Sequence, residues 1–192
     1  IAKGVNVTVI DDTKTPIKPD AIFPNNWVSF HPDGTVVLYP MLAINRRLER
    51  RPDILDTLGE KYNINKIIDL SIYEKETTFL EGTGSIIFDH INKIAYACLA
   101  PRTDKELFIK TCDLLGYKPI CFYSVDALGK EIYHTNVMMT IGNGYAVICL
   151  ESIHNPTEKE LVVNSLTNSG LKIIDISYAQ TSSFCGNMLE LE

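Results

Sequence analysis

The chain has 192 residues, 45% of them hydrophobic and 22% charged, and a formal net charge of −6 at pH 7. Such a length and composition predict one globular domain that buries a core, and the acidic balance argues against a nucleic-acid partner. The one basic cluster, residues 46–51, is short and is interrupted by Glu49, so we expect a small-molecule substrate.

Cysteine usage and hydropathy indicate the compartment. The five cysteines are an odd number and form no Cys-x-x-Cys pair, which fits a reducing compartment better than a disulfide framework. No apolar run reaches the roughly 18 to 20 residues of a spanning helix, so we expect a cytoplasmic protein without a membrane segment. Because the sequence begins at Ile1 and not at Met, an N-terminal targeting segment upstream stays open.

The first 70 residues predict an isolated strand, a hairpin, a helix and a further strand. The turn of the hairpin carries Pro32 and Gly34, which suit the second and fourth positions of a type I turn. Apolar side chains at helical spacing mark the helix. In chain order the elements are expected at residues 5–10, 27–30, 35–39, from 47 or 52 to 62, and at 66–70.

The order strand, strand, helix, strand occurs twice more. Thr103 and Glu106 have the spacing of a capping box at the start of the second long helix, and Gly116 and Gly170 end the second and third helices. The second unit is expected to use residues 85–89, 94–99, 103–115 and 119–123, and the third residues 137–141, 145–150, 156–166 and 171–176. The three repeats cover approximately residues 25–70, 80–124 and 133–177.

One polar residue precedes the first strand of each unit, namely Asn26, Glu81 and His134. Glu81 follows Asn26 by 55 residues and His134 follows Glu81 by 53, close to the upper end of the periods of repeat proteins. If the units pack around a common axis, these three side chains converge on one pocket. A histidine, a carboxylate and an amide together suit general acid/base chemistry on a bound substrate.

Each of these residues also has a purely structural interpretation. His134 could be a hydrogen-bonded core histidine, Glu81 a carboxylate that caps a loop, and Asn26 a turn former. Gly82 and Gly84 either let the main chain approach a ligand or form an ordinary tight turn. The four histidines lack the paired spacing of metal ligands, so neither a metal ion nor a dissociable cofactor is expected.

Five motifs stand out together: Phe23-Pro24-Asn25-Asn26-Trp27, residues 45–51, residues 80–85, Tyr133-His134-Thr135-Asn136-Val137, and residues 186–191. The chain that carries them resembles the amidinotransferase and arginine deiminase superfamily of guanidine-modifying enzymes, in particular its arginine-deiminase-related citrulline-utilisation hydrolases. The resemblance implies an α/β fold, a pentein-type propeller of pseudo-symmetric ββαβ repeats with about three of five units present. Residues 1–192 would form a single incomplete pentein domain, with the tail of a preceding unit at 1–10 and the start of a following unit at 184–192.

The resemblance also implies roles for individual residues. The superfamily uses a cysteine nucleophile, a histidine that shuttles protons and carboxylates that hold substrate nitrogens, and its motifs match His134 and Glu81 as catalytic residues. Arg102 matches an arginine that binds the substrate α-carboxylate, and Arg46 or Arg47 resembles the second such arginine. A guanidinium suits that task because it pairs with a carboxylate through two parallel hydrogen bonds.

Arginine deiminases carry aspartates at the positions of Asn26 and Asn136. Two aspartates neutralise a cationic guanidinium, whereas two asparagines match a neutral urea-like group and leave no buried carboxylate unpaired. We therefore expect these two residues to bind a ureido or guanidino amino acid, with citrulline favoured over arginine.

The nucleophile of the superfamily lies near the end of the chain in a glycine-rich segment, and nothing in this sequence matches it. Cys185 stands where relatives carry a small residue, and we interpret it as a packed thiol. We expect a Cys-His-Glu hydrolase in the full-length protein and no activity from these 192 residues alone. An amidinotransferase and a catalytically dead ligand-binding protein stay as alternatives, and a homo-oligomer that pairs apolar faces is left open.

Overall fold

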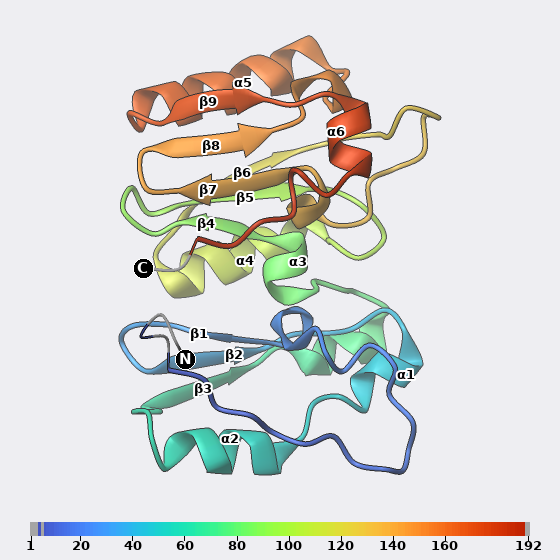
Figure 1. Ribbon diagram of the computed structural model, residues 1–192, viewed down its shortest axis with the longest axis vertical. Coiled ribbons are helices and arrows are strands. Elements are labelled where there is room, and N and C mark those ends of the chain that lie inside the picture. Colours follow the sequence, from blue (N-terminus) through green and yellow to red (C-terminus); the bar gives the residue numbers. More distant parts are fainter. Residues whose placement is uncertain (1–3, 5, 191–192) are drawn as a thin grey trace.

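Three three-stranded sheets of identical topology make up the structure, a computed structural model that describes residues 4 and 6–190 (Figure 1). In each sheet the first two strands form an antiparallel hairpin, and the third strand pairs in parallel with the second. A helix connects the second strand to the third. The predicted order strand, strand, helix, strand is therefore present in each sheet.

The bounds of the strands and helices are as follows. The strands are β1 (Val28–Phe30), β2 (Thr35–Leu38), β3 (Lys66–Asp69), β4 (Ile87–Asp89), β5 (Ile94–Cys98), β6 (Lys118–Phe122), β7 (Met139–Gly142), β8 (Tyr145–Ile148) and β9 (Lys172–Asp175). The α-helices are α1 (Ile44–Arg47), α2 (Pro52–Gly59), α3 (Gly82–Ser85), α4 (Lys105–Leu115), α5 (Pro156–Asn168) and α6 (Tyr178–Ser182). The 3-10 turns are η1 (Pro24–Asn26), η2 (Ser71–Glu76), η3 (Thr135–Val137) and η4 (Leu150–Ser152).

Turn chemistry explains the first hairpin. The Gly34 N–H donates to the carbonyl of His31 at 2.9 Å, and Gly34 has a φ of 79°, which an L side chain rarely adopts. The hairpin forms where the sequence predicts it, with β1 and β2 in the predicted stretches. The helix that follows begins at Pro52, one of the two predicted starts, and ends at Gly59 instead of Tyr62.

The start of α4 differs from the predicted capping box. The N-cap is Asp104, whose carboxylate accepts from the Leu107 N–H at 2.8 Å. Thr103 instead donates its hydroxyl proton to Ser85 Oγ at 2.8 Å. The prediction that Thr103 caps this helix is wrong because the neighbouring carboxylate takes the cap and leaves the hydroxyl to a buried partner.

Two predicted strands also begin later than expected. Ser85 ends α3 and Val137 ends η3, so β4 starts at Ile87 and β7 at Met139. The predicted polar residues thus lie in a helical turn (Asn26) or at the N-cap of one (Glu81 and His134).

The predicted N-terminal strand at residues 5–10 is not formed by residues 6–10, although its first residue, Val5, lies outside the described part of the chain. No described strand pairs with this stretch, and a β-strand needs such a partner for its backbone groups. Within the predicted start of a following unit, residues 184–190 are likewise free of strand, whereas residues 191 and 192 are not described.

Two hydrophobic clusters lie between neighbouring units, and a further one, with Trp27, Val28, Val36 and Met41, lies within the first unit. One cluster joins the second and third sheets and includes Tyr96, Phe122, Met138 and Ile148. A second cluster joins the first and second sheets and includes Tyr39 and Phe108. The middle sheet is therefore covered from both sides, and the three units form one continuous body along the vertical axis of Figure 1.

The short turn α3 lies at the junction of the units. It packs against η1 of the first unit and η3 of the third, and Figure 1 shows it between the lower sheet and the upper two. All five cysteines are free thiols. Within the described residues, no helix has the length and hydrophobicity needed to cross a bilayer.

Candidate active site

Three helical turns bring Asn26, Glu81 and His134 together. Asn26 ends η1, Glu81 is the N-cap of α3, and His134 is the N-cap of η3. His134 Nε2 lies 2.7 Å from Glu81 Oε2. A Cβ atom built on Gly84 would lie 2.3 Å from the side-chain amide of Asn26 and 2.9 Å from His134 Nδ1. The three side chains therefore lie close together, as the repeat predicts, and a side chain larger than that of glycine at position 84 would clash with two of them.

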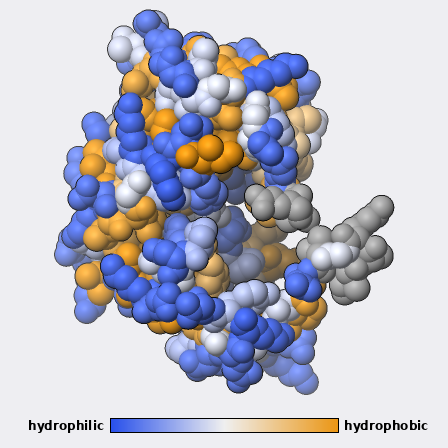
Figure 2. All heavy atoms as spheres, turned by 90° about the vertical axis from the view of Figure 1, so that its left-hand side faces the viewer, coloured by the Kyte–Doolittle hydropathy of each residue, from blue (hydrophilic) through white to orange (hydrophobic). Residues whose placement is uncertain are grey.

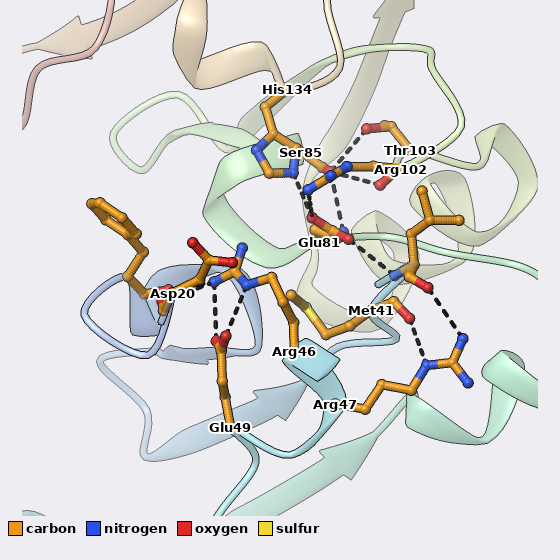
Figure 3. A network of polar contacts seen from close by, with 12 residues as sticks. Asp20, Met41, Arg46, Arg47, Glu49, Glu81, Ser85, Arg102, Thr103 and His134 are labelled. Atoms are coloured by element: carbon orange, nitrogen blue, oxygen red, sulfur yellow. Dashed lines mark hydrogen bonds and ion pairs between the residues drawn. The ribbon is translucent and has the colours of Figure 1, made fainter. Parts of the chain in front are cut away.

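Glu81 is fully buried and accepts hydrogen bonds at both carboxylate oxygens (Figure 3). Its Oε1 accepts from the Leu42 N–H at 3.0 Å, and its Oε2 accepts from His134 Nε2 and, at 3.2 Å, from Arg102 Nη1. Burial by itself raises the pKa of this carboxyl group, but the bond from His134 together with these donors and charges holds the pKa below its usual value. Glu81 is therefore an anion at neutral pH.

His134 is 5% exposed. Burial lowers the pKa of its imidazole, and the charges of Arg102 and Arg46 act in the same direction, outweighing the opposite effect of Glu81. The ring is thus neutral at pH 7, and an ionised Glu81 requires the proton on Nε2. Nδ1 then has a lone pair beside Gly84 and no hydrogen-bond partner among residues 4 and 6–190. This atom is suited to take a proton from a bound molecule.

The hydroxyl groups of Ser85 and Thr135 fix the backbone around the two catalytic candidates, Glu81 and His134. Ser85 Oγ accepts from the Glu81 N–H at 3.1 Å and donates to the carbonyl of Arg102 at 2.8 Å. Thr135, next to His134, donates to the carbonyl of Ser85 at 2.5 Å. Sequence reasoning missed both residues, although each is a small hydroxyl side chain within four positions of a candidate residue.

Arg102 faces Glu81 on one side and an aromatic ring on the other. Its guanidinium carbon lies 5.3 Å from the centroid of the Tyr133 ring. The Arg102 side chain is 29% exposed, and Tyr133 is 52% exposed. Arg102 therefore keeps contact with solvent beside the Glu81–His134 pair.

Arg46 is buried and bound to protein groups. Its Nε and Nη2 atoms donate to the two oxygens of Glu49 at 2.9 and 3.0 Å (Figure 3). Nη2 also contacts the carbonyls of Asp20 and Phe23 at 3.3 and 3.2 Å. This guanidinium is occupied by the protein, whereas the resemblance implied that Arg46 or Arg47 contacts a substrate carboxylate.

Arg47 holds the loop that serves Glu81. It donates from Nε to the carbonyl of Met41 at 2.9 Å and from Nη2 to that of Leu42 at 3.4 Å. The N–H of Leu42 is the donor to Glu81 Oε1, so Arg47 stabilises the loop that carries this donor and does not itself contact Glu81 in the described hydrogen bonds. Asn136 is half-buried in η3, two residues after His134.

A cavity of about 690 Å³ adjoins the site without including the Glu81–His134 pair. It is lined by the segment at residues 8–24 and by side chains of β1 and α2, with Asn25 and Thr83 at the edge near the site. Figure 2 shows the surface hollowed between the part of the molecule that holds the first sheet and the part that holds the other two. Among the described residues, no group of three or more His, Cys, Asp or Glu side chains could hold a metal ion.

Comparison with protein families gives one match to almost the whole chain. A model of the family described as N,N dimethylarginine dimethylhydrolase, eukaryotic, matches residues 2–192. No curated protein matches the chain.

Several solved structures share the fold. The chain is similar to ArgZ, an arginine dihydrolase of cyanobacteria (16% identity, TM-score 0.72, covering 94% of this chain and 26% of ArgZ). It is similar to a cysteine-to-alanine mutant of AgrE bound to L-arginine (20% identity, TM-score 0.78, 100% and 27%). A third relative is DDAH from Pseudomonas aeruginosa in complex with citrulline (11% identity, TM-score 0.53, 87% and 73%). The chain spans about a quarter of the length of the first two proteins.

Proposed function

The chain belongs to the eukaryotic N,N dimethylarginine dimethylhydrolase family, and from this premise we propose that it carries the proton-transfer half of a hydrolase. The reaction is cleavage of a C–N bond in the ureido or guanidino group of a small amino acid. The observation that carries the proposal is the buried Glu81–His134 hydrogen bond at 2.7 Å, which lies beside Asn26 and Arg102.

In the proposed reaction a cysteine thiolate attacks the carbon of the ureido or guanidino group. Glu81 fixes the proton on His134 Nε2, so that Nδ1 takes the proton of the cysteine thiol and gives it to the amine or ammonia that leaves when the covalent S–C intermediate forms. Nδ1 then takes a proton from the water that cleaves the S–C bond and returns it to the departing thiolate. Arg102 pairs with the α-carboxylate, because it combines a guanidinium fork with access to solvent. Arg46 and Arg47 would have to exchange protein partners to make the second such contact.

The thiols of this chain do not suit the nucleophilic role. Cys98 and Cys112 are buried, and burial raises the pKa of both thiols, that of Cys112 to about 12. Cys185 packs against the core that the second and third sheets share. We infer that the full-length protein supplies the thiolate from another segment and that these residues alone do not turn over substrate. The relative AgrE was solved with L-arginine as a cysteine mutant, which agrees with a cysteine-dependent reaction.

The two amides favour citrulline over arginine. Asn26 borders the site at Gly84, and Asn136 lies on the same turn as His134. Neither carries a charge, so neither can balance a cationic guanidinium, and the buried Glu81 is already paired with Arg102. A neutral ureido group needs no such counter-ion.

The test is to replace both asparagines by aspartate in the full-length protein. We expect kcat/KM for arginine to rise relative to that for citrulline. Unchanged preference would contradict the charge argument. Turnover of neither amino acid, together with a measurable Kd for citrulline or arginine in the unmodified protein, would favour the alternative of a ligand-binding protein without activity.

A further inference from the structure

The two ends of the Asn26 amide face different chemical surroundings. One end points at the guanidinium of Arg46, which offers only N–H donors. The other end lies over Gly84, at the point that His134 Nδ1 also approaches. With its oxygen toward Arg46, Asn26 accepts from Nη1 at 2.7 Å and from Nη2 at 3.2 Å. In the reverse orientation the amide NH2 would face donors and the oxygen would face acceptors.

Arg46 cannot easily turn away from Asn26. Its other nitrogens hold both oxygens of the buried Glu49, and Nη2 reaches the carbonyls of Asp20 and Phe23. Because the guanidinium is planar and its Nε and Nη2 atoms are held, the position of Nη1 is fixed as well. Nη1 faces the oxygen of Asn26.

We propose that Arg46 is a positioning residue that turns the NH2 group of Asn26, and not its oxygen, into the active site. Asn26 thereby presents a hydrogen-bond donor beside His134. A ureido group has a carbonyl oxygen that accepts such a bond, whereas a guanidinium group has only N–H donors and would oppose it. Arg46 thus selects for a neutral ureido substrate through Asn26. This last step rests on the proposed function, whereas the amide orientation does not.

The amide orientation is tested on the chain itself by NMR, without any substrate. We expect nuclear Overhauser contacts from the side-chain NH2 protons of Asn26 to the Hα protons of Gly84 and to the imidazole of His134. Contacts from these protons to the guanidinium of Arg46, without contacts to Gly84, would overturn the assigned orientation and the proposal with it.

The selection step is tested by calorimetric binding of L-citrulline and L-arginine to the wild-type chain, Arg46→Lys and Arg51→Lys. Lysine keeps the positive charge near Glu49 but lacks the second nitrogen that reaches Asn26. Arg51→Lys is the matched control, because Arg51 pairs with Asp53 and Asp12. Circular dichroism of each variant confirms that it is folded.

In Arg46→Lys we expect the ratio of citrulline to arginine affinity to fall roughly tenfold, the effect of about one hydrogen bond, whereas Arg51→Lys keeps the wild-type ratio. An equal ratio in both variants overturns the selection step. Binding of neither ligand to the wild-type chain overturns the proposed substrate class and the selection step for this chain, while the NMR contacts still decide the amide orientation.

Discussion

Replacing Glu81 by glutamine removes a negative charge and one acceptor oxygen from a fully buried position. The carboxylate serves three donors, the Leu42 N–H at Oε1 and both His134 and Arg102 at Oε2. Glutamine has one oxygen. If that oxygen replaces Oε2, the NH2 group opposes the Leu42 N–H; if it replaces Oε1, the NH2 group opposes His134 and Arg102. The first orientation leaves fewer donors unpaired and is the one we expect.

The loss of stability follows from these contacts. One buried donor without an acceptor costs about 1 to 3 kcal/mol, and a bond that loses its charged partner weakens by about 1 kcal/mol. The Arg102 bond counts for less, because that side chain is 29% exposed. The free energy of unfolding of Glu81→Gln should therefore fall by roughly 2 to 4 kcal/mol, which for a chain of this size lowers Tm by roughly 5 to 15 °C.

The assay is urea unfolding at pH 7, with an NMR titration of His134 alongside it. Because Glu81 raises the pKa of His134, its neutralisation should move the histidine titration to lower pH. Glu76→Gln is the matched control, since Glu76 is exposed and should change stability by less than about 0.5 kcal/mol. If Glu81→Gln is as stable as the control and His134 titrates as before, the buried pair does not organise the site.

Three further outcomes are expected. Gly84→Ala should abolish binding of L-citrulline in a calorimetric titration and destabilise the chain by roughly 1 to 3 kcal/mol, because the added Cβ would meet Asn26 and His134 at 2.3 and 2.9 Å; binding at wild-type affinity would contradict the geometry. The folded pKa values of His134 and Glu81 both lie below the unfolded values of 6.5 and 4.5, so on acidification the unfolded chain takes up these protons before the folded chain does. The free energy of unfolding should therefore be highest above about pH 7 and decline as the pH falls through 6.5 and 4.5. A free energy of unfolding that rises as the pH falls over this range would refute the signs of the two shifts. Asp104→Ala should lower the free energy of unfolding by about 1 kcal/mol through loss of the α4 cap, measured by urea unfolding with Glu160→Ala, an exposed carboxylate on α5, as the control; a loss no larger than that of the control would contradict the assigned cap.

The repeated sheets were predictable because their signals are local. The first hairpin depends on a turn with Pro32 and Gly34, and the glycines that end α4 and the third long helix are visible as single residues. The equivalence of Asn26, Glu81 and His134 was also predictable, because residues at the same place in three similar units occupy similar places in space. The repeat alone therefore predicts that the three side chains lie close together, without knowledge of any tertiary contact.

Other features depend on contacts that the sequence does not display. Arg46 pairs with Glu49 three positions away, a spacing that is visible in the sequence, but the burial of the pair and its contact with Asn26 are set by tertiary packing. The main-chain N–H of Leu42 has no sequence signal as a donor to Glu81. Apolar and polar residues alternate in the N-terminal stretch as they do in a strand. This pattern predicts which side chains share a face, but it does not show whether a neighbouring strand is present to pair with.

The turns that carry the site lie outside the sheets. Each of η1, α3 and η3 precedes a strand without taking part in its ladder, so a substitution at Asn26, Glu81 or His134 removes no hydrogen bond of a strand pair. Residues of the candidate site can therefore change while the sheets keep their topology. The comparison with ArgZ fits this separation, since the fold is shared at a TM-score of 0.72 with 16% identity. The hydrogen-bonded sheets define the shared fold, whereas the three turns carry the residues of the candidate site.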